Sequence, residues 1–197
     1  MSGAHNVANA LAVLAVAAEL GIDPAVAGLA LGGYTGVARR FQVLGERRGV
    51  TVVDDYGHHP TEIAATIAAA RARWPGRPLW CVFQPHQHSR TRALLREFAG
   101  AFAGADRVLL PDIFFARDSE EERRKVTSED LARLLVGRGT AAEYRATFDD
   151  VLGALARGIP DGAVLLTLGA GNVDEVARRF LASGEPPMHV DARRSAL

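Results

Sequence analysis

The sequence is poor in cysteine and lysine and has no long apolar run, and each shortage excludes a class of protein. Cys81 is the one cysteine among 197 residues, so an intrachain disulfide framework and a four-cysteine zinc site are excluded. Lys125 is the one lysine among 23 basic residues, and no glycine flanks it, so the chain carries no phosphate loop of the Walker type. No apolar stretch approaches the roughly 20 residues that a membrane-spanning helix needs.

A net charge is also lacking, because 23 Lys and Arg residues balance 23 Asp and Glu residues. Nucleic-acid binders usually carry an excess or a stripe of basic residues, so we predict no nucleic-acid partner. Residues 1–6 lack the basic segment and apolar core of a signal peptide, which predicts a cytoplasmic protein without a membrane partner. The length fits one large domain, or one domain with a fragment of a second.

Helix and strand patterns alternate along most of the chain, after two helices at the N-terminus. Residues 6–20 are rich in alanine and predict a helix with Asn6 as N-cap and Gly21 at its end, and Asp23-Pro24 opens a second helix. The strands expected next are a hairpin at 41–44 and 50–53, then 79–83, 107–110, 141–145 and 163–168. The helices expected among them are 61–73, 91–102, 128–136, 147–157 and 173–181.

This alternation is typical of βαβ units. We therefore predict an α/β, Rossmann-like fold with a mainly parallel sheet and helices on both faces, preceded by a short helical remnant of another domain. The apolar run at 79–83 contains Cys81, which we expect to be a small buried core residue. No internal repeat is present.

Polar side chains gather after the strand predicted at 50–53, where open α/β sheets bind their ligands. The segment 54–62 contains three carboxylates, a phenol and two imidazoles. Helix capping accounts for the part from Pro60 to Glu62, but it does not account for Asp55, Tyr56 and His58. We therefore predict a functional site here.

Two further clusters follow other predicted strands. In the segment 84–91, His86 and Arg90 favour a pocket for an anion or a carboxylate, although Ser89 could simply cap the next helix. Gly169-Ala170-Gly171 is equally compatible with a tight turn and with a backbone contact to a ligand. The mixed charges at 120–125 are typical of a solvated surface.

Two asparagines near the N-terminus, Asn6 and Asn9, lie about one helical turn apart and share a face of the predicted helix. An asparagine amide can donate to one ring nitrogen and accept from an exocyclic amine, so the pair could recognise the edge of an adenine. The alternative is that Asn6 caps the helix and Asn9 is satisfied locally.

Five strings of residues together resemble the Mur ligases, the ATP-dependent amide-bond-forming enzymes of peptidoglycan synthesis. They are Gly3-x-His5-Asn6-x-x-Asn9-Ala10-Leu11-Ala12, Gly36-Val37-x-Arg39-Arg40-Phe41, Asp54-Asp55-Tyr56-Gly57-His58-His59-Pro60-Thr61-Glu62, Phe83-Gln84-Pro85-His86 and Gly169-Ala170-Gly171. The third string is highly specific, and the fit extends to about residue 182. The strings are most similar to the members that join L-alanine to UDP-N-acetylmuramate. Tripeptide-recycling members share His-His-Pro-Thr but are expected to differ at Phe-Gln-Pro-His.

The resemblance implies a three-domain ligase of which this chain is a part. Residues 1–35 would be the last helices of the central ATP-binding domain, 36–185 the C-terminal Rossmann-like domain and 186–197 a flexible tail. The UDP-binding domain, the phosphate loop and the ligands of magnesium would lie upstream. We therefore expect no metal site and no complete catalytic set in this chain, and no activity from it alone.

The resemblance also assigns roles on the nucleotide side of the reaction. In the family, ATP phosphorylates the carboxylate of the UDP-sugar, and the amine of the amino acid then attacks the acyl phosphate. By position, His5, Asn6 and Asn9 would face the adenine. Arg40 would reach the phosphates of ATP, and Asp55 would reach the ribose or its neighbourhood.

On the amino-acid side, the resemblance assigns an L-alanine pocket to Tyr56, His58, His86 and Arg90, with Arg90 holding the carboxylate. Members of the family usually have arginine and an aromatic residue where this chain has Gln87 and His88. Either His88 partly replaces the lost guanidinium, or the affinity for the amino acid is lower. The segment 113–118 also departs from the family pattern.

Two alternatives remain from the residues alone. The chain could be a stand-alone Rossmann-like module that binds a nucleotide or an amino acid without turnover. It could also be a folding and interaction domain whose ligand contacts are silent in isolation. Ligand-induced stabilisation of the isolated chain would separate these two readings.

Overall fold

The computed structural model describes residues 4–34 and 36–183, without the side chains of Ala4 and His5. The chain divides after Ala38 into two compact units, each with its own internal contacts. Residues 186–197, for which the sequence predicts a flexible tail, lie outside the described part. No helix in the described part is long and apolar enough to cross a membrane.

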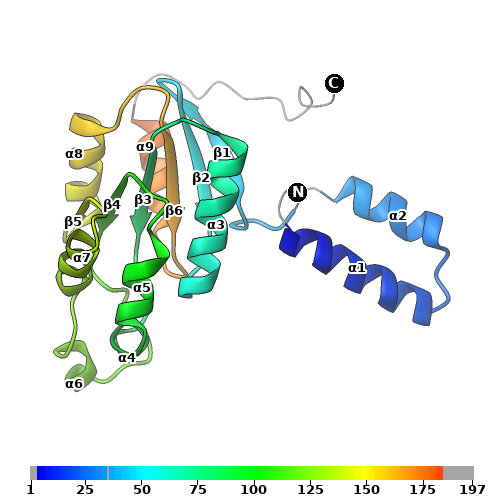
Figure 1. Ribbon diagram of the computed structural model, residues 1–197, viewed down its shortest axis with the longest axis horizontal. Helices are drawn as coiled ribbons and strands as arrows, with labels where there is room; N and C mark the ends of the chain where they lie inside the picture. Colours follow the sequence, from blue (N-terminus) through cyan, green and yellow to red (C-terminus); the bar gives the residue numbers. More distant parts are fainter. Residues whose placement is uncertain (1–3, 35, 184–197) are drawn as a thin grey trace. The chain divides into compact units, whose positions relative to one another are not determined.

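The first unit contains the helices α1 (Ala4–Glu19) and α2 (Pro24–Gly33) (Figure 1). Gly21, at a φ of 70°, ends α1 by donating to Ala18 O, and Ile22 donates to Ala17 O. Asp23 caps α2 by accepting from the N–H of Ala25, as the sequence predicts. The predicted N-cap role of Asn6 is wrong, because α1 begins at Ala4 and Asn6 lies inside its first turn.

The second unit is an α/β domain. Its described part contains a six-stranded sheet in the order β1-β2-β6-β3-β4-β5, with every neighbouring pair parallel except β1 and β2. The strands are β1 (Gln42–Arg47), β2 (Val50–Asp55), β3 (Leu79–Phe83), β4 (Arg107–Leu110), β5 (Ala142–Tyr144) and β6 (Val164–Leu168). The α/β fold with a mainly parallel sheet is confirmed.

The helices of this domain follow the strands in a regular order (Figure 1). They are α3 (Pro60–Arg73), α4 (His88–Ala93), α5 (Leu95–Ala101), α6 (Glu120–Arg123), α7 (Ser128–Gly137), α8 (Phe148–Gly158) and α9 (Asp174–Ala182). The single helix predicted at 91–102 is instead α4 and α5, separated at Leu94, whose N–H bonds to Arg90 O and whose carbonyl accepts from Phe98. Within the segment predicted as a solvated surface, α6 forms one short helical turn.

Each face of the sheet packs against a different set of helices. Alternate residues of the central strands, such as Cys81 and Phe83, pack against α3, α5 and α7, whereas Trp80 and Val82 pack against α8 and α9. Crossover connections between parallel strands share one hand. The helices that lead outward from β2 to β5 therefore cover one face, and α8, which returns the chain to β6, covers the other.

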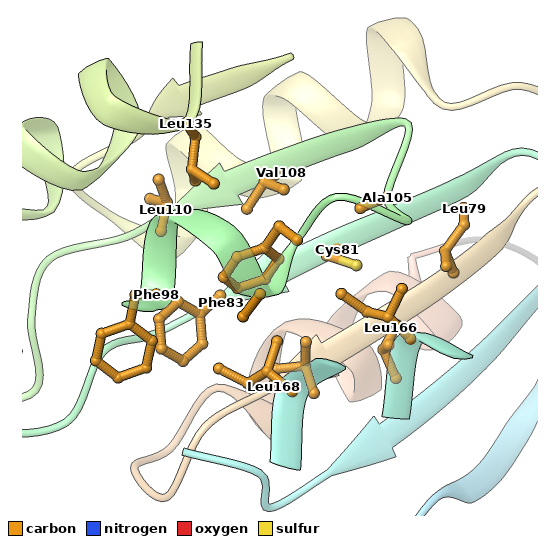
Figure 2. Close-up of a cluster of buried hydrophobic side chains, with 14 of the residues drawn as sticks. Leu79, Cys81, Phe83, Phe98, Ala105, Val108, Leu110, Leu135, Leu166 and Leu168 are labelled. Atoms are coloured by element: carbon orange, nitrogen blue, oxygen red, sulfur yellow. The ribbon is translucent and has the colours of Figure 1, made fainter. Parts of the chain in front are cut away.

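The larger core lies under α3, α5 and α7 (Figure 2). The ring of Phe83, which is fully buried, contacts those of Phe98 and Phe102, with centroids 5.3 Å apart in both pairs. Cys81 is buried in the same cluster, and burial raises the pKa of its thiol. The prediction that Cys81 is a core residue is confirmed.

Candidate functional site

Three neighbouring strands end at the same level of the sheet. Leu168, the last residue of β6, pairs with Asp55 at the end of β2 and with Phe83 at the end of β3. The segments that follow these strands are the three clusters that the sequence analysis singles out. The topology therefore brings them to one carboxyl edge of the sheet, where α/β folds bind ligands.

The carboxylate of Asp55 shapes the loop after β2. Its Oδ2 accepts from the N–H of Phe41 and its Oδ1 from the N–H of Gly57, each at 2.7 Å. Burial raises the pKa of Asp55, against the lowering effect of these N–H groups and of the charge of Arg40. A Cβ on Gly57 would lie 2.8 Å from Oδ1, so the turn requires glycine there. Asp55 thus holds the backbone that presents the next residues.

Tyr56 and His58 lie side by side in this loop, with ring centroids 5.5 Å apart in an edge arrangement. Nδ1 of His58 lies 3.1 Å from the carbonyl oxygen of Tyr56. Oε2 of Glu62 accepts from the N–H of His58 at 3.0 Å and from that of His59 at 3.1 Å. His59 is the N-cap of α3 and forms a capping box with Glu62. Capping therefore accounts for the residues from His59 to Glu62, while Tyr56 and His58 remain for a site.

The pKa of Glu62 reflects this arrangement. Burial alone would raise it, but the N–H groups and charges around the carboxylate, among them the N–H and the ring of His58, lower it below its usual range. Glu62 therefore carries a negative charge at neutral pH, next to the imidazole of His58.

Arg39 ties two of the three strand ends together, a role that the sequence analysis misses. Its Nε donates to Oδ2 of Asp54 at 2.9 Å, its Nη1 to Gly171 O at 2.8 Å and its Nη2 to Gly169 O at 2.7 Å. Its own carbonyl accepts from the N–H of Tyr56. The side chain of Asp54 is 1% exposed, so this ion pair is buried on the acidic side. One guanidinium thus joins the loop after β2 to the turn after β6.

The glycine turn after β6 is explained by packing. Gly169 has a φ of 144°, and a Cβ added to it would lie 2.7 Å from the carbonyl oxygen of Gln84. A Cβ on Gly171 would lie 2.5 Å from Oε1 of Gln84 and 2.9 Å from the ring of Phe114. These close approaches favour the reading of a tight turn, because each glycine is required by a neighbour within the protein.

The loop after β3 is held by the segment 113–118, whose sequence departs from the family pattern. The N–H of Phe114 bonds to Pro85 O at 2.8 Å, and the N–H of Gln87 bonds to Phe114 O at 3.1 Å. The ring of Phe114 stacks on that of His86, with centroids 5.3 Å apart and an angle of 14° between the planes. Phe114 therefore holds His86 both through backbone hydrogen bonds to its two chain neighbours and through ring stacking.

The imidazole of His86 lies within electrostatic reach of two other predicted residues, His58 and Arg90. Burial lowers the pKa of His86, and the nearby Arg90, His58 and Arg117 lower it further. The imidazole is therefore neutral at neutral pH. Its Nδ1 is buried without a hydrogen-bond partner in the described part of the chain, as is Oε1 of Gln84. Buried polar atoms without partners at a strand end are candidates for a bound ligand or water.

Asp118 caps α4 from a distant part of the chain. Its Oδ2 accepts from the N–H groups of His88 and Ser89, and its Oδ1 accepts from the Ser89 hydroxyl at 2.6 Å. Gln87, the residue before the helix, has a φ of 70° and a ψ of 129°, a conformation that non-glycine residues rarely adopt. Ser89 therefore lies within the first turn of α4 and is not its N-cap.

The ring of His88 is buried beside Asp118. Its Nδ1 lies 3.7 Å from Oδ2 of Asp118, and it meets the ring of Phe115 edge-on at 5.9 Å. Burial lowers the pKa of His88, against the opposite effect of Asp118. This placement gives no support to the hypothesis that His88 replaces the missing guanidinium, which stays untested.

The sequence-predicted residues thus fall into two groups. Asp55 ends β2, and Tyr56 and His58 follow it, whereas His86 follows β3 and Arg90 lies on α4. Arg40 belongs with the first group, since its guanidinium lies 5.5 Å from the centroid of the Tyr56 ring.

The second group lies in the other compact unit, on α1. Asn6 and Asn9 occupy positions one turn apart on this helix, and Asn9 is exposed. The side chain of His5 lies outside the described part. The nucleotide role of these residues stays a prediction. In the described part of the chain, no group of three or more His, Cys, Asp or Glu side chains is arranged to hold a metal ion.

Comparisons with known proteins agree with this architecture. Residues 39–171 match the family model "Mur ligase, glutamate ligase domain". The chain is 46% identical over 94% of its length to a UDP-N-acetylmuramate–L-alanine ligase of Acidithiobacillus ferrooxidans, and 48% identical over 91% to that of Nitratidesulfovibrio vulgaris. It spans 40% and 39% of the length of these relatives.

A solved structure gives the same picture. The crystal structure of UDP-N-acetylmuramate-alanine ligase from Thermotoga maritima superposes with a TM-score of 0.75 at 28% identity, over 93% of this chain and 38% of that one. The family model covers well over half of the chain, and the sheet that it matches carries the strand-end site. The chain therefore belongs to the Mur ligase family, as a part that contains the glutamate ligase domain.

Proposed function

We propose that this chain is the C-terminal part of an ATP-dependent ligase that joins L-alanine to UDP-N-acetylmuramate in peptidoglycan synthesis. The observation that carries the proposal is the meeting of Tyr56 and His58 with His86 and Arg90 at one edge of the sheet, in a chain 46–48% identical to L-alanine ligases. Fold alone does not specify chemistry, so these side chains must supply the argument.

We assign the amino-acid side of the reaction to side chains of the loops after β2 and β3. The guanidinium of Arg90 has no hydrogen-bond or ion-pair partner within residues 4–34 and 36–183, and α4 holds it next to His86. A planar guanidinium with free donors suits a carboxylate. The unpartnered Nδ1 of His86 and the rings of Tyr56 and His58 complete a small polar pocket for L-alanine.

The nucleotide side is assigned to Arg40, Asp55 and the asparagines of α1. Arg40 forms no ion pair with a carboxylate of the described residues, so its charge is free for the phosphates of ATP. Both oxygens of Asp55 already hold backbone N–H groups, so a ribose would share an oxygen with one of them. His5, Asn6 and Asn9 would face the adenine. We assign magnesium to ligands outside this chain.

The first unit supports the proposal that further domains belong to the working enzyme. Its helices expose large apolar side chains, among them Leu11 at 61%, Val16 at 60% and Leu29 at 78%. Apolar residues that recur along a helix pair are usually covered by other parts of the protein. We propose that the central domain of the same ligase covers them. A reaction that consumes ATP and a UDP-sugar also places the enzyme in the cytoplasm.

The proposal is tested by phosphate release from ATP in the presence of UDP-N-acetylmuramate and L-alanine. The assay is run on this chain alone and after addition of the N-terminal and central domains of a relative as a separate polypeptide. We expect no release from the chain alone and release dependent on L-alanine after complementation. Release from the chain alone would show that a phosphate loop from another domain is not needed. Nucleotide or amino-acid binding without any turnover would favour a binding module instead.

A matched pair of variants tests the assignment of the carboxylate site. In the complemented enzyme, Arg90→Ala should raise the KM for L-alanine about 10- to 100-fold, because a hydrogen bond to a charged group contributes about 1.5–3 kcal/mol. Arg92→Ala is the control, since Arg92 lies on the same helix but pairs with Glu122 at the surface. An equal change in both variants would contradict the assignment.

A further inference from the structure

The hydrogen bond of His58 fixes which of its ring nitrogens carries the proton. Nδ1 lies 3.1 Å from the carbonyl oxygen of Tyr56, and a carbonyl oxygen can only accept. In the neutral imidazole, Nδ1 must therefore hold the hydrogen and Nε2 must hold the lone pair. No described residue forms a hydrogen bond with Nε2, so this acceptor is available to a ligand.

A carboxylate stands behind the donor side of the same ring. Oε2 of Glu62 lies 3.7 Å from Nδ1 and also holds the N–H groups of His58 and His59. Its negative charge favours an imidazolium that forms when Nε2 takes up a proton. The carbonyl of Tyr56 thus orients the ring, and the carboxylate of Glu62 contributes its charge at 3.7 Å, two tasks that a single carboxylate performs in a catalytic triad. Glu62 is held in place by the capping box of α3, so the arrangement is rigid.

His86, the other imidazole at this edge of the sheet, is less suited to accept a proton. The ring of His86 stacks on Phe114, its Nδ1 is buried, and no described carboxylate forms an ion pair with it. The positive charges of Arg90 and Arg117 oppose its protonation. Near His58, Arg40 adds a positive charge that acts on the same carboxylate, and the neutral ring of His86 adds none, but Glu62 lies 3.7 Å from the ring of His58.

We propose that His58 is the base that removes a proton from the ammonium group of the incoming amino acid. The inference rests on the proposed function. The ammonium gives one proton to Nε2 of His58, and the neutral amine attacks the carbonyl carbon of the acyl phosphate. A C–N bond forms, the bond from that carbon to the phosphate oxygen breaks, and the departing phosphate takes the second proton of the amine. His58 then returns its proton to water.

The test compares two nucleophiles in the complemented ligase. Hydroxylamine is largely unprotonated at neutral pH and reacts with acyl phosphates without help from a base, whereas L-alanine must first lose a proton. His58→Asn keeps an N–H that can donate to Tyr56 O but lacks a basic nitrogen. General-base catalysis contributes roughly 10²- to 10⁴-fold, so the ratio of alanine-dependent to hydroxylamine-dependent kcat should fall about 100-fold or more.

His59→Asn is the matched control. Asparagine is a good N-cap, so α3 keeps its start, and the ratio of the two rates should stay at the wild-type value. If His58 only shapes the pocket, His58→Asn lowers both rates together and the ratio is unchanged, which overturns the inference while the proposed function stands. If the wild-type complemented enzyme shows no turnover with L-alanine, the proposed function fails and the inference fails with it.

A second measurement needs no activity. Heteronuclear NMR of the ring nitrogens in this chain should show His58 protonated at Nδ1 in its neutral form. A neutral ring protonated at Nε2 would overturn the inference, because the lone pair would then face Tyr56.

Discussion

The helical hairpin formed by α1 and α2 and the α/β domain use apolar residues in opposite ways. Among the described residues of the hairpin, Ala17 and Ala27 are the buried hydrophobic residues, while Leu29 is 78% exposed. In the α/β domain, Phe83 and many aliphatic side chains are fully buried in two clusters. The hairpin is therefore stabilised mainly by its own backbone hydrogen bonds and caps, and the domain by burial of apolar surface.

The helix caps show the same contrast. Asp23 caps α2 from within the hairpin by accepting from Ala25, two residues away, and the contact is exposed. Asp118 caps α4 from a loop 30 residues further along the chain, and its side chain is buried. Local contacts of the first kind hold one helix, whereas the second kind joins two segments of the site. Loss of the second kind should therefore change more of the structure.

The largest difference in the free energy of unfolding is expected between a buried residue of the α/β domain and an exposed residue of the hairpin. Phe83→Ala removes a fully buried ring between Phe98 and Phe102 and should lower the free energy of unfolding by about 3–5 kcal/mol. Leu11→Ala removes a side chain that is 61% exposed and should change it by no more than about 0.5 kcal/mol. Urea unfolding followed by the fluorescence of Trp74 and Trp80, both in the α/β domain, measures the first. Circular dichroism measures the second.

If Leu11→Ala were as destabilising as Phe83→Ala, the stated contrast between the hairpin and the α/β domain would be wrong. It would mean that the exposed face of α1 is covered in solution. Sedimentation analysis of the same samples would then show whether a second copy covers it, because oligomer formation makes the apparent stability depend on protein concentration.

The sequence predicts most of the elements correctly because their signals are local. The apolar run from Leu79 to Phe83 is buried on both faces, as expected for a central parallel strand. Pro60 opens α3 and Glu62 completes its capping box, and both signals lie within a few residues of the helix start. The order of strands and helices also limits the topology, which is why polar clusters after different strands could be expected to meet.

The contacts that build the site join distant residues, and for these the sequence gives little signal. Arg39 binds Gly169 and Gly171, which lie 130 and 132 residues further along the chain. Phe114 stacks on His86, and Asp118 caps α4, although nothing in the segment 113–118 marks it as a partner of the loop after β3. A single sequence shows which side chains can carry chemistry, but it does not show which residues hold them in place.

The next largest effect concerns the remote cap. Asp118→Ala leaves two N–H groups of α4 and the Ser89 hydroxyl without their acceptor, and should cost about 1.5–3 kcal/mol. Asp23→Ala removes an exposed local cap and should cost about 0.5–1 kcal/mol. Urea unfolding of both variants checks the difference. Equal losses would show that the burial of Asp118 adds nothing.

The remote cap also predicts a pH dependence. Burial alone would raise the pKa of Asp118, but the hydrogen bonds from Ser89 and His88 lower it below its usual range. The unfolded chain therefore binds the proton first, near the ordinary pKa of about 3.9. The stabilisation is fully present above that pH and is lost as the pH falls through the lowered pKa of the folded state. In Asp118→Asn, this part of the acid sensitivity should disappear.

The smallest effects should differ in sign between the units, because alanine replaces glycine in two opposite surroundings. Gly171→Ala places a Cβ 2.5 Å from Gln84 and 2.9 Å from Phe114 and should destabilise the α/β domain by about 1–3 kcal/mol. Gly28 lies in the middle of α2, where an added Cβ would meet no atom within 4 Å beyond its chain neighbours and the backbone of the helix, so Gly28→Ala should stabilise that helix by about 0.5–1 kcal/mol. Thermal unfolding followed by circular dichroism measures both changes. A stabilising Gly171→Ala would mean that the turn after β6 can move away from Gln84, and the packing explanation of the glycine turn would then be wrong.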